Sequence, residues 1–488
     1  MKHKLSFFLF LVLNLNLYSQ TTFFKWYPTT LDEFIYPVLE LSGGNFLIGG
    51  GAGPEYYAYH QKCLLKIDPS GNVLASITSE LADTSTYYVC LFNLPGEGNG
   101  FGAAVDYIYG NNGHNYINYS LDKYSGDFEL ISKKTFTFPA DYGLFPQYSL
   151  GINDSLFLIQ FNEVTYLPYF HHIGSVVSKY NYQFDNLGSY TETTSDIAAF
   201  GMLKNPQNNT IKVFNCKSSI STTVSEINMD MQFLKKSNLP RIITSPSSTG
   251  IDESTYMVTG VVHSPNTQHH LKVWKYNYSY VLLDSVEYYN RPDTVLYGGA
   301  MKNTTIVGDK IVVVGNYNFD PSTFPFQNSP TWIQITRIDT NLQIIDHHFY
   351  GGDAAYMPYN IISTTDGGAL IVGNRYDYLS STANQYDVFA LKVNELGLIT
   401  ELPNQPQAKA HDAILYPNPG SEILNIQSGP QINGAQFTLY DMQGRAMRTE
   451  TITATALKLT TSTLPFGTYP WQIVYKNKVI ESGKWVKE

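Results

Sequence analysis

A repeat constrains the fold of this chain more than any other feature. Short apolar runs begin at residues 46, 101, 156, 211, 256, 311 and 370, so that successive runs stand 45 to 59 residues apart. A period of this size is typical of repeat folds, in which each unit is one supersecondary structure that buries its apolar face against its neighbours. We therefore expect about seven similar units within the 488-residue chain.

Each unit is predicted to contain four β-strands. Gly, Asn and Asp, which tolerate the positive φ of tight hairpins, precede most of the first runs. A second run follows each first run and ends in Asp or Asn, as in Cys63–Asp68, Ile117–Asp122 and Val388–Asn394. Such side chains can accept hydrogen bonds from the backbone of the next turn. A third run such as Val73–Ile77, and an apolar stretch ahead of each first run such as Phe34–Leu41, complete the set.

Seven four-stranded units of this length are what a seven-bladed β-propeller requires. The outer run of the last unit, Leu398–Leu402, is short, whereas Thr22–Tyr27 belongs to no unit. We predict that Thr22–Tyr27 supplies the missing strand and closes the ring, because closure hides sheet edges. Six or eight blades, or stacked β-sandwiches, are the alternatives. The hairpins at Ile67–Leu74 and Asp366–Gly373 resemble those of kelch-like and related secreted bacterial propellers, and this likeness implies the fold but no activity.

The N-terminal residues predict export. Lys2 and Lys4 precede an apolar run over Leu5–Leu13, and a plausible cleavage region follows, so we predict a signal peptide over residues 1–19. The apolar run is shorter than the roughly twenty residues that span a bilayer. No later stretch approaches that length, so no transmembrane segment is predicted.

Composition argues against several classes of protein. The net charge of −10 is opposite to the basic footprint of a nucleic-acid-binding protein. The three cysteines, Cys63, Cys90 and Cys216, form no CxxC motif, so neither a disulfide framework nor a metal site is indicated. We expect buried thiols, with a Cys63–Cys90 disulfide as the alternative.

Histidines recur before the second-type runs but do not predict a metal site. They fall in four different units, at His60, His114, His171, His172, His269 and His270. Equivalent positions in a ring of blades stand far apart, and adjacent residues of a strand point to opposite faces of the sheet. We therefore predict no metal, and no other cofactor.

The connections between the first and second runs are the long ones. They are expected over Gly49–Gln61, Tyr109–Tyr116, Gln160–Ser175, Val262–His269, Asn316–Thr331 and Asn374–Asp387. Because alternate connections of a propeller emerge on opposite faces, these six segments should share one face, which we call the long-loop face. Long loops on a rigid scaffold are where recognition usually occurs.

Aromatic residues are abundant in these loops. We expect ligand-binding residues among Tyr56, Tyr57, Tyr59, Tyr166, Tyr169, Phe324, Tyr376 and Tyr378, where the rings would stack on a glycan or pack against a protein partner. The alternative is that the loop aromatics fold back over the blades as a small core of their own.

Enzyme motifs are sparse. The chain has no GxSxG, HExxH or P-loop motif. Carboxylates near the long-loop face include Glu55, Asp106, Glu163, Asp320 and Asp377, but the sequence does not bring any two together as an acid and base. Binding of an extracellular ligand is therefore the leading hypothesis. A carbohydrate-active enzyme with Asp or Glu at the channel mouth and a purely structural surface protein are the alternatives.

The last part of the chain predicts a second, smaller domain. A polar, proline-marked linker over residues 403–413 separates the propeller, residues 20–402, from alternating runs that suit a small immunoglobulin-like β-sandwich over residues 414–488. Pro470 favours an edge position for its strand, since proline cannot donate to a sheet ladder.

Motifs in this domain resemble, in order, those of the C-terminal sorting domain of type IX secretion cargo: Tyr416–Pro419, Leu439–Arg445, Leu464–Tyr469 and Gly483–Lys487. The sorting residues implied by the resemblance are Pro417, Asn418, Pro419, Gly444, Gly467, Tyr469, Lys484 and Lys487. The resemblance implies export to the periplasm of a Gram-negative cell, recognition by the type IX machinery, passage across the outer membrane and removal of the domain. The product would be secreted or held at the cell surface.

Overall fold

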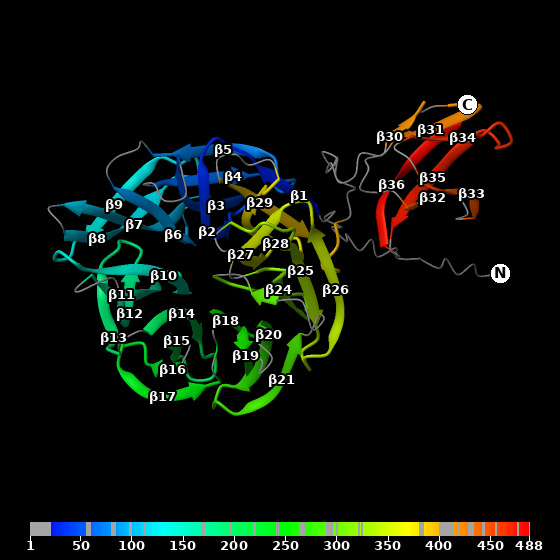
Figure 1. Cartoon of the computed structure of the whole chain (residues 1–488). Helices are drawn as coiled ribbons and strands as arrows, with labels where there is room; N and C mark the ends of the chain where they lie inside the picture. The colour runs from blue at the N-terminus through cyan, green and yellow to red at the C-terminus, as the bar shows by residue number, and fades with distance from the viewer. Residues whose placement is uncertain are drawn as a thin grey trace, which may run out of the picture. The chain divides into compact units, whose positions relative to one another are not determined.

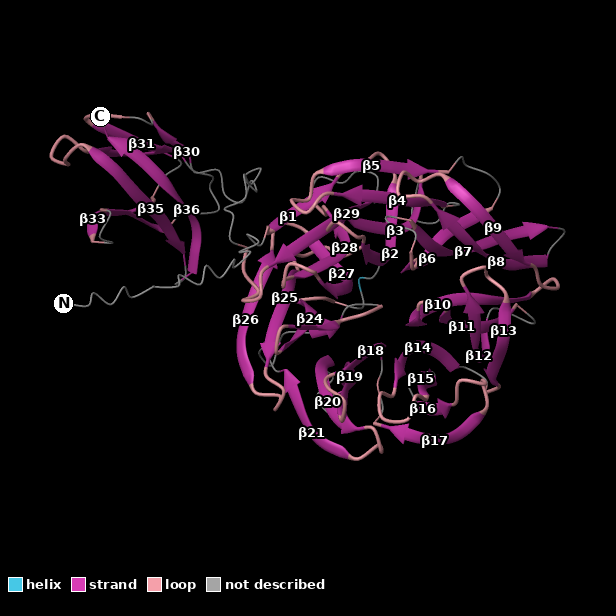
Figure 2. Cartoon of the chain, turned by 180° about the vertical axis from the view of Figure 1, so that it is seen from behind, coloured by secondary structure: helices cyan, strands magenta, loops and turns pink. Residues whose placement is uncertain are grey.

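The computed structural model covers the whole chain and describes most of its residues. These are residues 21–54, 60–79, 84–96, 100–111, 114–166, 171–194, 197–217, 221–240, 242, 244–263, 269–288, 296–298, 301–320, 323, 326–379, 385–399, 414–417, 420–427, 434–441, 445–453, 456–475 and 478–487. The chain divides into two compact units, Met1–Pro403 and Asn404–Glu488. Every element with given bounds in the described ranges is a β-strand, and Figure 2 shows nearly all of the drawn structure as strands and loops.

The described residues of the first unit form seven sheets, which Figure 1 shows arranged as a ring. Blade 1 contains β2 (Asp32–Glu40), β3 (Phe46–Gly53), β4 (Gln61–Ile67) and β5 (Val73–Thr78). Blade 2 contains β6 (Ser85–Asn93), β7 (Phe101–Asn111), β8 (His114–Tyr124) and β9 (Leu130–Phe136). Blade 3 contains β10 (Tyr142–Asn153), β11 (Leu156–Thr165), β12 (His171–Asn181) and β13 (Asn186–Glu192). Blade 4 contains β14 (Ile197–Lys204), β15 (Ile211–Lys217), β16 (Ser221–Ile227) and β17 (Phe233–Leu239).

The remaining sheets depart slightly from this plan. Blade 5 contains β18 (Thr244–Gly250), β19 (Thr255–His263), β20 (His269–Asn277) and β21 (Leu282–Tyr288). Blade 6 divides its inner strand into β22 (Leu296–Gly298) and β23 (Thr304–Val307), which both pair with β24 (Lys310–Tyr317), and continues with β25 (Trp332–Ile338) and β26 (Ile344–Gly351). Blade 7 contains β27 (Ala355–Ser363), β28 (Ala369–Tyr376) and β29 (Tyr386–Val393), with β1 (Phe23–Tyr27) as its outer strand. The predicted β-propeller is confirmed, and the seven sheets of the described residues agree with the predicted number of blades.

The N-terminal strand closes the ring, as predicted. β1 pairs antiparallel with β29 over Phe23↔Lys392 to Tyr27↔Val388. Because the first and last parts of the propeller share one sheet, blades 7 and 1 cannot separate without breaking this ladder. Apolar side chains then fill the spaces between neighbouring blades; Ile48 of blade 1, for example, shares a buried cluster with Val372 of blade 7.

An equivalent turn follows the third strand of each blade. Asp68 shows its geometry, because its Oδ1 accepts hydrogen bonds from the N–H groups of Ser70 and Asn72, both at 2.8 Å. The same two bonds, to residues two and four positions further on, are made by Ser125, Asn181, Asn228, Asn277, Asp339 and Asn394. We call these seven residues the turn caps. The predicted role of Asp or Asn is confirmed in six blades.

The prediction is wrong in blade 2. Asp122 does not cap the turn but lies buried within β8, where it pairs with Lys62 at 3.1 Å. Strand β8 runs on to Tyr124, and Ser125 caps the turn with its hydroxyl oxygen instead. A serine oxygen accepts the same two backbone bonds, so the turn survives the change.

Cations tie neighbouring blades together next to these turns. Lys66, two residues before the cap Asp68, donates to the carbonyl of Gly126 in blade 2 at 2.7 Å. Equivalent contacts run from Lys179 to Met229, from Lys275 to Thr340 and from Arg337 to Glu395. In each case the acceptor is the residue directly after the next blade's cap. A charge-assisted bond of this kind contributes about 1.5–3 kcal/mol.

The long connections are shorter than predicted, because the strands extend into them. β7 and β8 remain paired up to Asn111↔His114, so Tyr109–Tyr116 is a strand hairpin and not a loop. Similarly, β11 continues to Thr165 and β28 to Tyr376. Alternating aromatic residues suit a strand as well as a loop, which is why these strands were predicted to end earlier than they do.

The second unit forms two sheets from its described residues. One has the order β30 (Ile414–Tyr416), β31 (Ile423–Gln427), β34 (Ala456–Thr460), and the other has the order β33 (Ala446–Thr451), β32 (Gln436–Tyr440), β35 (Gly467–Tyr475), β36 (Lys478–Lys487). Residues of both sheets, including Leu424 and Phe437, share one buried cluster, which agrees with the predicted sandwich.

The strand that contains Pro470 is not at the edge of its sheet, contrary to expectation. β35 lies between β32 and β36. However, its pairing with β32 ends at Leu439↔Trp471, so Pro470 lies beyond that end and pairs with β36 alone. Pro470 therefore has an edge-like environment inside a central strand, which explains why the ladder tolerates it.

Candidate functional site

The structure describes three of the eight predicted ligand-binding residues. Tyr56, Tyr57, Tyr59, Tyr169 and Phe324 lie outside the described residues. Tyr166 follows β11, is half-buried, and its backbone N–H donates to the carbonyl of Asp141 at 2.9 Å. Burial raises the pKa of its hydroxyl.

Tyr376 and Tyr378 belong to an aromatic cluster of blades 6 and 7. The Tyr376 ring is 6 % exposed and lies 5.3 Å from Phe326 and 5.5 Å from Tyr386, centroid to centroid. Tyr378 packs against the same cluster, as does Phe326. In this part of the long-loop face the aromatic residues form the small core that was the alternative prediction. Ligand contact by Tyr376 or Tyr378 stays a prediction.

The histidines pair with carboxylates at different places. His60 Nε2 lies 3.2 Å from Asp32 Oδ2, and both side chains are buried. His114 Nδ1 lies 2.6 Å from Asp141 Oδ2, between blades 2 and 3. Within the described ranges, no group of three His, Cys, Asp or Glu residues is placed to hold a metal ion. The cysteines form no disulfide: Cys90 and Cys216 are buried thiols and Cys63 is half-buried.

Asp32 also joins the two ends of the propeller. Besides its contact with His60, its Oδ1 accepts a hydrogen bond from the N–H of Tyr386 in blade 7 at 2.8 Å. The Gln385 amide donates to the carbonyls of Thr30 and Pro54. We call this junction of blades 7 and 1 the seam. Its polar contacts fix the long-loop ends of β2, β4 and β29 relative to one another.

Three tyrosines of the inner strands meet beside the seam. Tyr36 on β2 lies 6.1 Å from Tyr87 on β6 and 6.3 Å from Tyr359 on β27, and both contacts are edge-on. All three side chains are half-buried. The His60 ring stacks on Tyr87 at 5.8 Å. We call Tyr36, Tyr87 and Tyr359 the tyrosine arc.

The sequence did not predict the arc, because its tyrosines lie on inner strands and not in the long loops. Aligning the first strands of the units would have shown that several contain tyrosines, among them residues 36, 87 and 359. It would not have shown that these rings touch, since the three residues come from opposite ends of the propeller sequence.

The predicted carboxylates do not form an acid–base pair in the contacts observed. Glu163 accepts a hydrogen bond from the Tyr142 hydroxyl at 2.7 Å, and Asp377 lies 3.7 Å from Arg375. Asp106 is buried in blade 2, where burial raises its pKa well above the ordinary value. The Asp320 backbone contacts the Gln327 side chain, and Glu55 lies outside the described residues. These residues belong to different blades, so the geometry assigns none of them to catalysis.

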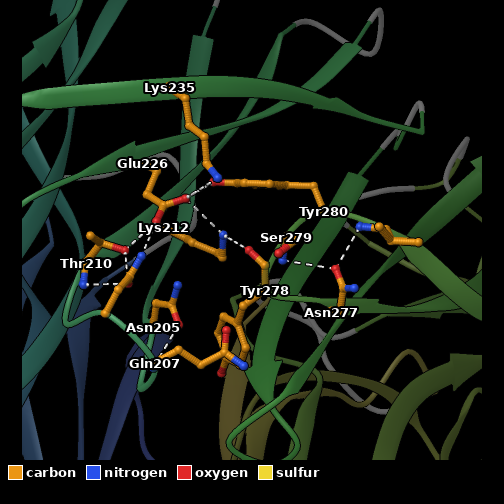
Figure 3. Close-up of polar contacts among 12 residues, drawn as sticks. Asn205, Gln207, Thr210, Lys212, Glu226, Lys235, Asn277, Tyr278, Ser279 and Tyr280 are labelled. Carbon is orange, nitrogen blue, oxygen red and sulfur yellow. Dashed lines mark hydrogen bonds and ion pairs between the residues drawn. The ribbon is translucent and has the colours of Figure 1, made fainter.

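The buried ion pair of Lys212 and Glu226 is a structural contact (Figure 3). Glu226 occupies the position at which other blades carry the blade-tying cation, and Lys212 lies opposite it on β15. Lys212 Nζ lies 3.3 Å from Glu226 Oε2 and donates to the Tyr278 carbonyl at 2.9 Å, directly after the cap Asn277. Lys212 therefore replaces the missing cation and ties blade 4 to blade 5.

Hydrogen bonds surround Glu226. Its carboxylate accepts from the hydroxyls of Thr210 and Tyr280 at 2.5 and 2.6 Å. Despite burial, these bonds and the Lys212 charge lower the pKa of Glu226 to about 2, whereas burial lowers the pKa of Lys212 to about 8. Every group in the cluster is satisfied, which favours a structural role over a reactive one.

The sorting residues occupy defined places in the second unit. Tyr469 is buried and donates to the carbonyl of Pro465 at 2.7 Å, and the Lys487 ammonium contacts the carbonyl of Ser421. The carbonyl of Pro417 accepts from the Trp485 indole at 2.8 Å. Gly467 begins β35 and Lys484 is exposed on β36. Asn418, Pro419 and Gly444 lie outside the described residues.

Comparison with known families agrees with these motifs. Residues 414–488 match the family described as the secretion system C-terminal sorting domain. The C-terminal domain is a type IX sorting domain. It implies interaction with the secretion machinery, export, and a secreted or cell-surface location. Within the described residues there is no helix with the length and apolar character needed to cross a membrane.

Other comparisons carry no functional argument. No curated protein matches the chain. Among solved structures, a fungal alcohol oxidase of the AA5 family in complex with copper is 10 % identical with a TM-score of 0.42, covering 95 % of this chain and 99 % of that one. A protein of unknown function from Dyadobacter fermentans is 7 % identical with a TM-score of 0.46, covering 76 % and 97 %. An α-L-arabinofuranosidase from Fusarium graminearum is 10 % identical with a TM-score of 0.41, covering 77 % and 97 %.

Proposed function

We propose that the propeller of this exported protein binds an extracellular glycan at the long-loop face, beside the seam of blades 7 and 1. In this proposal the signal peptide, residues 1–19, and the sorting domain, residues 414–488, are removed, and residues 20–402 do the binding. The tyrosine arc is the observation that carries the proposal.

The arc has the features of a carbohydrate-binding surface. Its three half-buried rings combine an apolar body with a hydroxyl group, a combination that suits contact with both the C–H and O–H groups of a sugar. Hydrogen-bonding side chains lie next to it: His60 stacks on Tyr87, and the Asn360 amide donates to the carbonyl of Tyr36 at 3.1 Å. Packing on three blades holds the rings in place, so little entropy is lost on binding.

A glycan array with the secreted protein tests the proposal, followed by titration of the best glycan. Tyr36→Ala and Tyr359→Ala should each weaken binding at least about tenfold, or about 1.4 kcal/mol, because each removes a central contact. Tyr190→Ala, on the outer strand β13 of blade 3, is the matched control: its ring is also half-buried, and it stacks on Phe233 at 6.2 Å.

The outcomes separate the hypotheses. Loss of binding in the arc variants but not in Tyr190→Ala supports the proposal, provided that thermal unfolding shows all variants to be folded. Equal binding by the arc variants, or capture of a protein in place of any glycan, would contradict it. The same titration with Tyr56→Ala and Tyr57→Ala tests the loop tyrosines predicted from the sequence.

A further inference from the structure

A cavity of about 350 Å³ lies between the closing strand β1 and blade 1. Its floor is formed by buried residues of blades 1 and 7: Glu33, Ile35, Ile48, Leu64 and Val388. Exposed residues of the β1–β2 connection and of β5 surround its mouth: Pro28, Thr29, Ser76 and Thr78. The volume falls at the lower end of the range for ligand pockets and would hold roughly a dozen water-sized groups.

One buried polar atom in this cavity lacks a partner. Glu33 is 8 % exposed, and its Oε2 makes no hydrogen bond. A buried carboxyl oxygen without a donor costs about 1–3 kcal/mol, so a native structure that keeps one calls for an explanation. A ligand with a hydrogen-bond donor at this position would remove the cost.

The charges around Glu33 favour a cation. Burial, together with the nearby Asp387 and Asp32 carboxylates, raises the pKa of Glu33 to about 8. The other titratable groups of the lining, Cys63 on β4 and Tyr27 on β1, supply no positive charge; burial raises the pKa of both. Arg375 of blade 7 is the nearby cation, but its guanidinium is committed to Asp353 at 3.1 Å and lies over the Trp26 ring at 4.8 Å.

Most of the remaining lining is apolar. Trp26, Leu31, Ile35, Leu65 and Val388 would contact the body of a ligand, leaving Glu33 as the buried carboxyl group. A sugar would lose most of its hydrogen bonds with water on such a surface, and an anion would be repelled. A compact amine with an apolar body satisfies both the carboxyl and the walls.

We propose that this cavity binds a small apolar amine whose ammonium group donates to Glu33 Oε2. The site is separate from the tyrosine arc, so its existence does not depend on glycan binding. Phenethylamine is a suitable probe, because it joins an aromatic body to a primary ammonium. The neutral 2-phenylethanol, of nearly equal size, tests the charge.

Calorimetric titration of the full-length protein should show saturable binding of phenethylamine and at least tenfold weaker binding of 2-phenylethanol. Binding should also be about tenfold tighter at pH 8 than at pH 6.5, since the ammonium requires Glu33 to release its proton. Glu33→Gln should weaken binding of the amine at least tenfold and abolish the pH dependence. Glu163→Gln, which alters a half-buried carboxylate of blade 3, should leave the affinity for the amine and its pH dependence unchanged.

Two further measurements do not depend on altering Glu33. Ser76→Tyr places a ring at the exposed mouth and should block entry of the amine without touching the core. Phenethylamine should also raise the midpoint of thermal unfolding of the unaltered protein, whereas 2-phenylethanol at the same concentration should raise it far less. Equal affinity for amine and alcohol, unchanged binding in folded Glu33→Gln, or absence of amine binding would each overturn the proposal.

Discussion

Bulky residues with positive φ recur at one position of the blade turns, three residues after each turn cap. Five blades carry an apolar or aromatic side chain there, with φ between 61° and 70°: Phe128, Phe184, Met231, Tyr280 and Leu342. Left-handed backbone costs such residues about 1–2 kcal/mol. Burial offsets the cost, as for Phe184 and Leu342, which are both 2 % exposed. Packing between blades therefore stabilises these residues in a backbone conformation that is otherwise unfavourable.

The other two blades place glycine at this position, and Gly71 shows why. Its φ is 76°, and a Cβ there would lie 2.6 Å from the ring of Phe23, which fills the space in place of a side chain from the turn. We predict that Gly71→Ala destabilises the propeller by about 2–4 kcal/mol, because strain adds to a clash with β1. Gly43→Ala is the control: its φ is 95°, but no atom lies within 4 Å of the added Cβ. Urea unfolding that shows equal losses of unfolding free energy for Gly71→Ala and Gly43→Ala would contradict the prediction.

The ion pair of Lys212 and Glu226 predicts a dependence of stability on acid. The folded pKa of Glu226, about 2, lies below the value of about 4.3 for an unfolded chain. The Glu226 charge therefore stabilises the folded protein above about pH 4.3, and this stabilisation is lost as the pH falls towards 2. Glu226→Gln should cost about 3–5 kcal/mol at pH 7, where it leaves Lys212 buried without its charge partner.

The difference in free energy of unfolding between Glu226→Gln and the unaltered protein should shrink below pH 4, because acid then removes the Glu226 charge from the unaltered protein as well. Denaturant titrations from pH 2.5 to 7 measure this difference. Glu253→Gln, at an exposed residue of the β18–β19 turn, should follow the unaltered protein at every pH. A constant difference across the whole range would show that the charge of Glu226 is not what stabilises the pair.

At the scale of elements, closure by β1 should dominate the stability of the ring. Phe23 is 5 % exposed and contributes to the cluster that joins blades 7 and 1. Phe23→Ala should cost about 3–5 kcal/mol, the usual loss for a buried ring, and should also increase self-association because it loosens the strand that covers β29. Phe349→Ala, at a ring on β26 that is 44 % exposed, should cost far less. Unfolding curves and sedimentation velocity measure the two effects. A Phe23→Ala protein that is as stable and as monomeric as the control would show that closure by β1 does not dominate the stability of the ring.

The sequence predicted the elements better than their ends. Period and turn chemistry are local, so the blades, the closing strand and six of the seven turn caps follow from them. The use of Ser125 in place of Asp122 as the cap of blade 2 does not follow from them, because it depends on where β8 ends. The tyrosine arc depends on residues 36, 87 and 359 meeting in space. The cavity depends on how β1 packs against blade 1, which no local pattern records.

At the scale of the molecule, two compact units carry separate tasks. Residues Met1–Pro403 hold the propeller with its candidate sites, and Asn404–Glu488 hold the sorting domain. Each unit has its own buried core, since the aromatic cluster of Phe437 and Trp471 belongs to the second unit alone. Loss of the second unit should therefore affect export while leaving the propeller folded.

Deletion of residues 414–488 tests this separation in the native cell. The truncated protein should accumulate in the periplasm, because the type IX machinery has nothing to recognise, whereas the full chain should reach the medium or the cell surface. Fractionation with immunoblotting measures the distribution, and limited proteolysis of the trapped protein checks that the propeller is folded. A reporter that carries the predicted signal peptide, residues 1–19, at its N-terminus and residues 403–488 at its C-terminus should be exported and is the reciprocal control. Normal secretion of the truncated chain would show that the propeller carries its own export signal and would contradict the division of tasks.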